Sequence, residues 1–546
     1  MLRVTVVQVP GARVRARRDG AAWEVKVERL QALQQLAVTS VSAGAIRSLD
    51  VTIDRWRPPI PGWLGRPGLP GLVEISIEPK GAGVRLCLGA VEPVDPALLL
   101  AAAVRCLRPV ATGGVGPLLT FAPGLPAQAS CLAGHLHDVL LPDESRDAHV
   151  RRSDVLLAPN AESPTWPERS VTVRVSESTW TRDGHGFEVS VDPTVHRPVG
   201  RRSAGVTEVA PARVAGDVVA VVTADGDIGI HGDVSPANAM ALRGIRAVVA
   251  DVLPDRLARQ LHACGVIVVA GEATLPDAAD DLAWQAWSVH ERRHALRQYG
   301  PSAALDSWPS VSVVLVTHRP DHLEHALRQL SGLRYPRLQI VIGAHGDRVD
   351  AARLWDLAQD VPHPVAVHAI DGARSLGEAL QECCDRADGA LVTKMDDDDF
   401  YGPEHVWDLV LAREYSGAQV VGKALDWIHL ESTDTTAFRP TYPAERYADF
   451  VAGGTILLSR SDLNAVGGWR PVPKSVDRAL LDRVLADGGL VYRTHGLGYV
   501  YVRHSAGHTA SVADEHFLTR TSATFAGLVR HEAFGTADAL PGGATR

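Results

Sequence analysis

The chain has 546 residues, of which 46% are hydrophobic and 22% are charged, and its net charge at pH 7 is −9. This length predicts about three to four domains, and the composition is that of a soluble globular protein rather than a disordered one. The acidic balance lacks the basic footprint of a nucleic-acid-binding protein, so we expect no nucleic acid among the partners.

The cysteines and apolar runs indicate a compartment. Six cysteines occur without a CxxC pair, which favours reduced, buried thiols in the cytosol. The longest apolar run, PALLLAAAVRCL, is interrupted by Arg105 and is shorter than the about 20 residues that span a membrane. The apolar run at the start of the chain is too short for a signal peptide. We therefore expect a cytoplasmic protein without a transmembrane span, and peripheral contact with the inner face of a membrane stays open.

The composition and the hydrophobic pattern of the sequence change along the chain. The first part is rich in Pro and Gly, with alternating stretches such as WEVKVERL and SVTVRVSES that predict a β-rich or mixed module of unknown role. The apolar run DVVAVVTADG (217–226) then predicts a buried strand, and Ser235 is expected to cap the helix that follows, so this part has a βαβαβ pattern. Its loop DGDIGIHGD could cradle a phosphate or form a tight turn. The expected domains are residues 1–210, 211–300 and 309–525, with a tail at 526–546.

The third region begins with the strand VSVVLVT, which ends at Thr317. A helix follows in which apolar residues recur on one face, and then the strand LQIVIGAHG, the helix SLGEALQECCDRADG and the strand ALVTKM. Four consecutive aspartates, 396–399, come directly after that last strand. In open α/β sheets, ligands bind at the carboxyl ends of the strands. Three of the chain's few lysines, Lys394, Lys423 and Lys474, lie in this region, which hints that an ammonium group is required there.

This order of motifs resembles the inverting family 2 type glycosyltransferases of GT-A fold. In that family a hydrophobic strand runs into D-x-D-D with a proline shortly after, as in Asp396-x-Asp398-Asp399 and Pro403. The segment FVAGGTILLSRSDLNAVGGW resembles the family's acceptor-side segment, and SVDRALLDRVLADGG resembles its E-D helix. The resemblance covers residues 309–525. It implies an α/β fold whose C-terminal part is a Rossmann-like mixed sheet with flanking helices, preceded by the βαβαβ half domain and the β-rich module.

The resemblance also implies an activity and its partners. It implies a metal-dependent inverting transfer of a sugar from a nucleotide-sugar donor to a hydroxyl of a glycan or glycolipid acceptor, in polysaccharide biosynthesis. The nucleoside diphosphate that leaves gains negative charge, and Mn²⁺ or Mg²⁺ held by carboxylate oxygens would stabilise it. A solvated acidic turn is the alternative for the aspartates. On the donor side the resemblance implies Thr317, Arg319, Asp396 and Asp397, and as metal ligands it implies Asp398, Asp396 and His508.

The proton of the attacking hydroxyl requires a base, and Asp477 is the candidate. It is expected in the first turn of a helix that Ser475 caps, where it would alternatively only complement the helix dipole. Asp482 is the fallback base, although its place in the helix suits a salt bridge better. Lys474 and Arg478 flank Asp477 and could meet the diphosphate, and Arg503 could pair with a phosphate. His504 is a weaker match than His508 for a metal ligand. Asp399 could lie in the outer shell of the metal or cap the turn.

The chain also departs from the family. Ala344-His345 stands where an acidic pair usually holds the nucleotide base, and Asp347 could substitute, so the donor nucleotide stays open. The absence of Q-x-x-R-W argues against a processive synthase. Two other functions were weighed. A sugar-phosphate nucleotidyltransferase requires a glycine-rich loop that VTHRPDHL lacks, and a non-catalytic glycan-binding or scaffold protein is supported only by the missing acidic pair.

Overall fold

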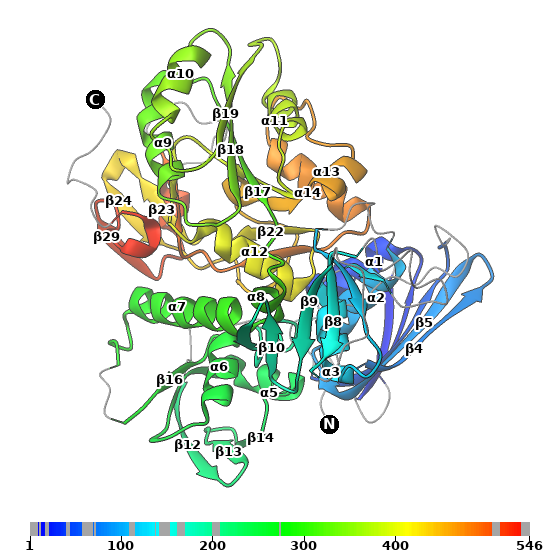
Figure 1. Cartoon of the computed structure of the whole chain (residues 1–546). Helices are drawn as coiled ribbons and strands as arrows, with labels where there is room; N and C mark the ends of the chain where they lie inside the picture. Colours follow the sequence, from blue (N-terminus) through cyan, green and yellow to red (C-terminus); the bar gives the residue numbers. More distant parts are fainter. Residues whose placement is uncertain are drawn as a thin grey trace. The chain divides into compact units, whose positions relative to one another are not determined.

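The computed structural model describes residues 9, 12–16, 21–39, 44–56, 69, 72–108, 115–136, 138–140, 153–160, 170–198, 208–271, 275–504 and 514–536 (Figure 1). The chain forms two compact units, one made of Met1–Val199 and Val206–Trp308 and the other of Gly200–Gly205 and Pro309–Arg546. Helices and strands alternate in both units, so the α/β class predicted from the sequence is confirmed.

The first unit begins with a sheet in the strand order β1-β2-β3-β5-β4. In β2, buried Trp23 and Val25 alternate with exposed Glu24 and Lys26, which is the pattern of a sheet with one covered face. The helices α1 and α2 pack against each other, and α2 contacts β3 and β5. The elements are β1 (Ala12–Ala16), β2 (Ala22–Val27), α1 (Leu30–Thr39), β3 (Ile46–Ile53), β4 (Leu72–Lys80), β5 (Gly83–Val94) and α2 (Pro96–Leu107).

A second sheet of this unit has the order β11-β10-β9-β8-β6-β7. Its strands β7, β6, β8 and β9 are parallel, and β10 and β11 extend it as an antiparallel hairpin. Buried Leu157, Val173 and Trp180 form its core with Ala304 and Leu305. The elements are β6 (Leu118–Phe121), α3 (Ala127–Leu136), β7 (Asp138–Leu140), β8 (Val155–Pro159), β9 (Val171–Val175), β10 (Thr179–Arg182), β11 (His185–Glu188) and α8 (Pro301–Leu305).

The third sheet of the unit corrects one prediction. The run 217–226 was expected to supply the first parallel strand, but its strand β13 pairs antiparallel with both neighbours, and β12 is the strand parallel to β15. The reason is a tight turn at Gly216, whose φ of +64° lets the chain double back. The expected glycine-rich loop DGDIGIHGD (225–233) is not all loop, because it includes the strand β14, which pairs antiparallel with β13. Ser235 caps α5 as predicted.

The order of this sheet is β14-β13-β12-β15-β16, and β15 and β16 are parallel. Its elements are β12 (Glu208–Ala215), β13 (Val218–Val221), β14 (Ile228–His231), α5 (Pro236–Ala241), η1 (Leu242–Gly244), β15 (Ile245–Val249), α6 (Asp255–Ala263), β16 (Ile267–Val269) and α7 (Asp281–Tyr299).

The second unit contains a mixed sheet in the order β19-β18-β17-β20-β26-β22-β27-β25. The first four strands are parallel, and β26 joins them antiparallel to β20. Buried, mostly β-branched residues fill β17, as expected for a strand covered on both faces. The strands are β17 (Val311–Thr317), β18 (Leu338–His345), β19 (Val365–Ile370), β20 (Leu391–Met395), β22 (Val420–Lys423), β25 (Arg446–Tyr447), β26 (Leu457–Ser459) and β27 (Val491–Thr494).

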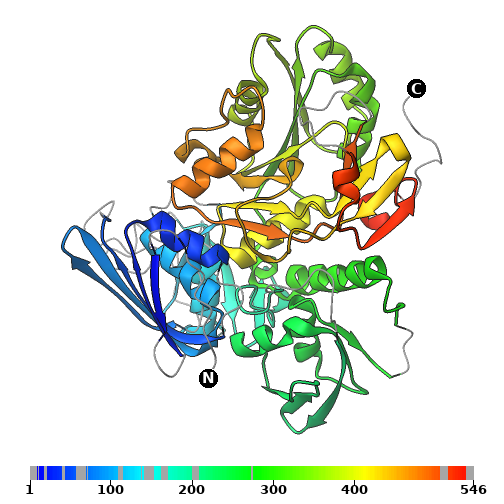
Figure 2. The ribbon, with the colours of Figure 1, turned by 180° about the vertical axis from the view of Figure 1, so that it is seen from behind.

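Helices cover both faces of this sheet. Figures 1 and 2 show α9 and α10 on one side of β17 and β18 and α11, α13 and α14 on the other. Leu323, Ala326 and Leu330 form the buried stripe of α9, and a capping box of Ser375 and Glu378 begins α11. The unit thus has the mixed sheet and flanking helices that the resemblance implies for a GT-A domain. The helices are η2 (Pro320–His322), α9 (Leu323–Ser331), α10 (Ala351–Ala358), α11 (Leu376–Asp385), α12 (His405–Ser416), α13 (Arg460–Ala465) and α14 (Val476–Ala486).

A smaller sheet, β21-β28-β23-β24-β29, completes the second unit. Trp427 is fully buried between Phe438 and Phe534, with ring centroids 4.5 and 5.1 Å away. Phe534 and Thr536 are themselves fully buried, so residues 526–536, which we expected in a tail, are folded, whereas 537–546 lie outside the described residues. The elements are β21 (Phe400–Tyr401), β23 (Trp427–Leu430), η3 (Glu431–Thr433), β24 (Thr435–Phe438), η4 (Gly453–Thr455), β28 (Tyr499–Arg503), α15 (Asp514–Leu518), β29 (Ala523–Ala526) and η5 (Glu532–Phe534).

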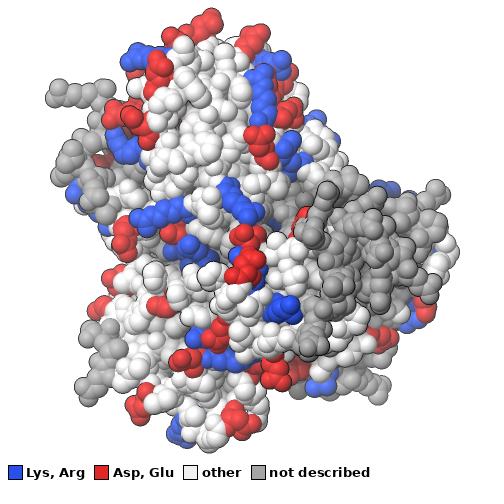
Figure 3. All heavy atoms as spheres, in the orientation of Figure 1, with Lys and Arg blue, Asp and Glu red and all other residues white. Residues whose placement is uncertain are grey.

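The surface and the thiols bear on the compositional predictions. Within the described ranges, no helix combines the length and hydropathy needed to cross a membrane. Figure 3 shows Lys and Arg side chains interspersed with Asp and Glu on the face that it draws. The cysteines that the described part includes are free thiols, and burial raises the pKa of the Cys383 and Cys384 thiols to about 12.

Candidate active site

The four aspartates follow β20 at the carboxyl edge of the parallel strands, as predicted. β20 lies beside β17, so the turn that holds residues 396–399 adjoins Thr317 and the residues after it. The four side chains have different partners, drawn from segments far apart in the sequence. Each aspartate therefore has its own environment, and the run is not a solvated acidic turn.

Asp396 faces Asp477 across a buried lysine. The Lys394 Nζ lies 2.9 Å from Asp396 Oδ1 and 3.2 Å from Asp477 Oδ1, and the lysine side chain is only 5% exposed. Burial alone would lower the pKa of Lys394, but the charges of the two carboxylates hold it above its usual value. Burial also raises the pKa of Asp396, against the effect of Lys394. Lys394 therefore joins a strand-end aspartate to the predicted base as one charged cluster.

Two glycines let the backbone approach this cluster. A Cβ atom at Gly453 would lie 2.2 Å from Asp477 Oδ2, and one at Gly454 would lie 2.8 Å from Asp396 Oδ2. Both residues belong to η4, in the segment that resembles the acceptor side of the family. Only glycine leaves room for both carboxylates at these positions.

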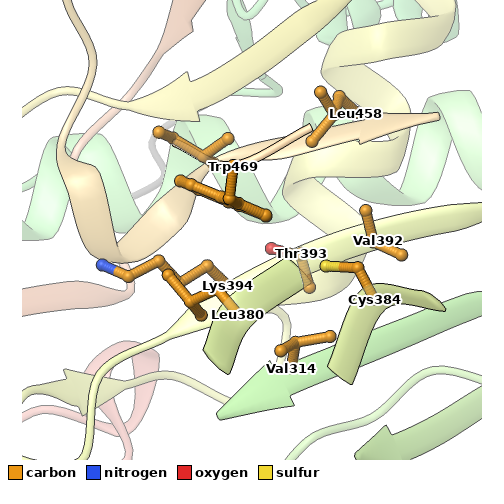
Figure 4. A pocket seen from close by; sticks show the side chains of 9 residues that line it. Val314, Leu380, Cys384, Val392, Thr393, Lys394, Leu458 and Trp469 are labelled. Carbon is orange, nitrogen blue, oxygen red and sulfur yellow. The ribbon is translucent and has the colours of Figure 1, made fainter. Parts of the chain in front are cut away.

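Lys394 reaches the cluster from an apolar pocket behind β20. Figure 4 shows its ammonium nitrogen turned away from the apolar side chains that line the pocket, among them Val314, Leu380 and Trp469. The pocket holds the aliphatic stem and leaves the charge at the end to the two carboxylates. It belongs to the core of the unit, which orients the lysine from behind.

Asp397 turns to the end of β17. Its carboxylate accepts a hydrogen bond from the Thr317 hydroxyl and is gripped by Arg319 through Nε, at 3.1 Å, and through Nη2. Thr317 Oγ1 also accepts from the backbone N–H of Arg319 at 3.0 Å. Asp397 is buried, so its role in this geometry is to fix Arg319 at the edge of the sheet.

Asp398 lies among cationic and imidazole groups. Arg319 Nη2 lies 2.8 Å and His504 Nε2 3.5 Å from Asp398 Oδ2. Burial alone would raise the pKa of Asp398, but the hydrogen bonds and charges of His504 and Arg319 hold it below its usual range, and Asp398 in turn raises the pKa of His504. One ligand atom each of Asp398, His504 and His322 lie within 4.8 Å of one another. This set of one carboxylate and two imidazoles fits a divalent cation.

Asp399 has a structural position. It is fully buried, and its carboxylate accepts hydrogen bonds from the Tyr499 hydroxyl at 2.7 Å and the Val502 N–H at 2.8 Å. Its carbonyl oxygen accepts one from His325 Nε2 at 2.8 Å. Burial, with the charges of the neighbouring aspartates, raises its pKa well above the usual value. Asp399 therefore ties the turn to β28 and α9 and does not face the edge of the sheet.

Other candidates lie apart from this cluster. Arg478 pairs with Asp482 at 2.8 Å on the exposed side of α14, and Lys474 is exposed. Arg503 pairs with Asp514 at 3.2 Å. Ser475 precedes α14 with a φ of +57° and makes no side-chain cap, which differs from the cap that we expected. Asp347 is exposed, and His508 lies outside the described residues.

Sequence reasoning did not identify His322, nor the link between Lys394 and Asp477. His322 could have been found, because it lies in the first turn after β17, and the residues after neighbouring parallel strands meet at one edge. His345, which replaces part of the acidic pair, is held by the Arg374 carbonyl oxygen at 3.0 Å from its Nε2 and faces His318 edge-on.

Comparison with known proteins gives a partial likeness. No family model matches the sequence, and no curated protein does. Solved structures that are similar include TarS (residues 1–349) from S. aureus in complex with UDP-GlcNAc, with 13% identity and a TM-score of 0.31 over 38% of this chain and 63% of that one. Another is the mannosyltransferase PcManGT from Pyrobaculum calidifontis in complex with GDP-Man and Mn²⁺, with 15% identity and a TM-score of 0.29 over 37% of this chain and 58% of that one. The chain thus spans less than two thirds of the length of these structures, and the likeness carries no conclusion about its activity.

Proposed function

We propose that the second unit is a metal-dependent inverting glycosyltransferase, which transfers a sugar from a nucleotide-sugar donor to a hydroxyl acceptor. The observation that carries the proposal is the meeting of Asp396 and Asp477, 81 positions apart, on Lys394, with Asp398 in the same turn. Separate carboxylates at the carboxyl edge of a parallel sheet provide what the reaction requires, which is a cation ligand on the donor side and a base on the acceptor side.

On the donor side, Arg319 supplies a positive charge for the diphosphate, and Asp396 and Asp397 bind or position the nucleotide. Asp398 holds the cation together with a downstream histidine, for which His504 is the described candidate. A bound Mn²⁺ or Mg²⁺ would neutralise the charge that develops on the diphosphate leaving group.

On the acceptor side, Asp477 Oδ takes the proton of the acceptor hydroxyl. The hydroxyl oxygen forms a bond to the anomeric carbon while the bond from that carbon to the diphosphate oxygen breaks, and the configuration inverts. Proton removal by a positioned carboxylate contributes about 10²–10⁴-fold to the rate. Lys394 holds the carboxylate in place, and the backbone of Gly453 passes directly beside it. The acceptor class is a glycan or glycolipid of polysaccharide biosynthesis, used in the cytoplasm or at the inner face of a membrane.

The test is a screen of UDP-, GDP- and dTDP-sugars for hydrolysis and transfer, with Mn²⁺ or Mg²⁺ and with chelator. Asp398→Ala should abolish the metal-dependent turnover, and Asp477→Asn should lower transfer about 10²-fold or more while donor binding persists. Asp482→Asn is the matched control, because this aspartate lies on the same helix with its side chain 55% exposed and paired with Arg478. It should transfer at the wild-type rate.

The outcomes separate the parts of the proposal. If no donor binds or turns over in a metal-dependent way, the domain is not a transferase of this kind, and binding of a glycan without turnover would indicate a scaffold role. If Asp477→Asn retains full transfer while Asp482→Asn does not, Asp482 is the base.

A further inference from the structure

We infer that His322 is a protein ligand of the cation, so that Asp398, His504 and His322 together bind a divalent transition-metal ion before any nucleotide is present. This rests on the proposed cation site and deepens it. A cation held mainly by one carboxylate and the donor's phosphates would bind weakly without donor and would accept Mg²⁺ readily. Two imidazole ligands would strengthen binding without donor and would disfavour Mg²⁺.

The three ligands come from three separate segments. His322 ends the turn η2 after β17, Asp398 follows β20, and His504 follows β28. One ligand atom from each lies within 4.8 Å of the others, and the rings of His322 and His504 meet nearly edge-on, with centroids 5.3 Å apart. A contraction of up to about 1.5 Å would bring these atoms to the spacing of about 3.3–3.6 Å between the ligands of a tetrahedral cation with bonds of about 2.0–2.2 Å.

Asp399 connects these three segments through contacts within the protein. Its carboxylate binds Tyr499 and the backbone of Val502 on β28, two residues before His504. Its carbonyl oxygen binds His325 on α9, three residues after His322. Asp399 itself is adjacent to Asp398. The buried aspartate therefore joins all three ligand-bearing segments, so the site is assembled by the fold and needs no donor phosphate to form.

His504 has the surroundings of a metal ligand. Its Nδ1 lies 3.5 Å from Glu431 Oε1, and its Nε2 is the atom directed to Asp398. A histidine that binds metal usually donates its other ring N–H to a carboxylate, which fixes the ring and leaves the ligating nitrogen with its lone pair. Glu431 is placed for that role.

The local charge also suits a cation. Arg319 approaches Asp398, but it grips Asp397 with both Nε and Nη2. Two carboxylates, Asp397 and Asp398, thus face the single positive charge of Arg319, so net negative charge remains to attract an ion. Imidazole ligands suit the later first-row divalent ions, whereas Mg²⁺ prefers oxygen ligands only. The site is therefore expected to bind Mn²⁺, and still more Co²⁺ or Zn²⁺, in preference to Mg²⁺.

The experiment measures metal binding by the full chain after chelator treatment, without nucleotide. Titration with Mn²⁺, followed by electron paramagnetic resonance of the unbound ion, should show one site that Mg²⁺ displaces only at about 10-fold higher concentration or more. His322→Ala should weaken Mn²⁺ binding about 10–100-fold. His290→Ala, which removes an exposed histidine of the first unit, is the control and should bind as wild type does.

A spectroscopic measurement on the wild-type chain counts the histidine ligands directly, so this part of the test does not depend on whether a variant folds. Electron spin-echo modulation of bound Mn²⁺ should show coupling to the nitrogens of two histidines, and in His322→Asn to one. The inference is overturned if Mn²⁺ does not bind without nucleotide, if Mg²⁺ competes equally, or if His322 variants leave affinity and nitrogen coupling unchanged. Because no donor is used, these results are separate from failure of the transferase proposal, which would appear as absent donor turnover with metal binding intact.

Discussion

Replacement of Lys394 by Met tests whether the two carboxylates of the candidate site form one unit. Met keeps most of the length and the apolar stem of lysine, so the pocket behind β20 stays filled. Only the ammonium group is lost, and with it contacts of 2.9 Å to Asp396 and 3.2 Å to Asp477. Lys394→Met therefore leaves two neighbouring carboxylates without their shared counter-ion.

The magnitude follows from burial. Removal of one partner of a fully buried ion pair costs about 3–5 kcal/mol. The lysine is 5% exposed, but the carboxylates of Asp396 and Asp477 are 35% and 32% exposed, so water recovers part of their solvation. We expect a loss of about 2 kcal/mol, which corresponds to a Tm decrease of about 4–8 °C for a unit of this size.

A double-mutant cycle by calorimetry provides the assay. In Asp477→Asn one of the two charges that Lys394 neutralises is absent, so Lys394→Met should cost about 1 kcal/mol less in that background. Transfer should also fall in Lys394→Met, because the proposed base Asp477 loses the group that orients it. The reasoning is refuted if Lys394→Met unfolds within about 1 °C of wild type, or if the two effects add without coupling.

Three further outcomes are expected. Gly453→Ala places a Cβ 2.2 Å from Asp477 Oδ2. It should lower transfer about 10²-fold and destabilise the unit by about 1–3 kcal/mol. Transfer at the wild-type rate would contradict the proposed acceptor side. Burial raises the pKa of Asp426 to about 7, so the stability that depends on the protonated carboxyl is full below the usual carboxyl pKa and is lost as the pH rises from about 4 to 7. Asp426→Asn should therefore raise the free energy of unfolding by up to about 4 kcal/mol at pH 8 and by less at pH 5. Equal increases in Tm at the two pH values would refute this. Phe534→Ala should cost the second unit about 3–5 kcal/mol in calorimetry, which also identifies that unit's transition, whereas Leu518→Ala, at a side chain 39% exposed, should cost far less.

Local patterns determined where the candidate site lies. The apolar run that ends at Thr317 and the one that ends before Asp396 predict buried parallel strands, and such strands bring the residues that follow them to one edge. The helical pattern placed Asp477 in the first turn of α14. These features depend on the period of the chain and on its turn residues, so the sequence suffices for them.

The same patterns failed where strand pairing decides. The run 217–226 has the composition of a buried parallel strand, yet it forms a hairpin strand because the chain turns back at Gly216. Residues 526–536 were expected in a tail, but Phe534 packs against Trp427, and this contact between distant segments exists only in the folded unit.

Tertiary structure alone decided which partners each of the four aspartates contacts. The partners of the Asp397 carboxylate precede it by about 80 positions, and those of the Asp399 carboxylate follow it by about 100. Lys394 meets Asp477 across 83 positions, and His322 meets His504 across a longer separation. By itself the sequence determined that a cluster of carboxylates stands at the edge of a parallel sheet. Which carboxylate lies near Lys394, Arg319, the two histidines or the core depends on contacts between distant segments. Such side-chain partners are set by sheet order and register and leave no periodic trace in the chain.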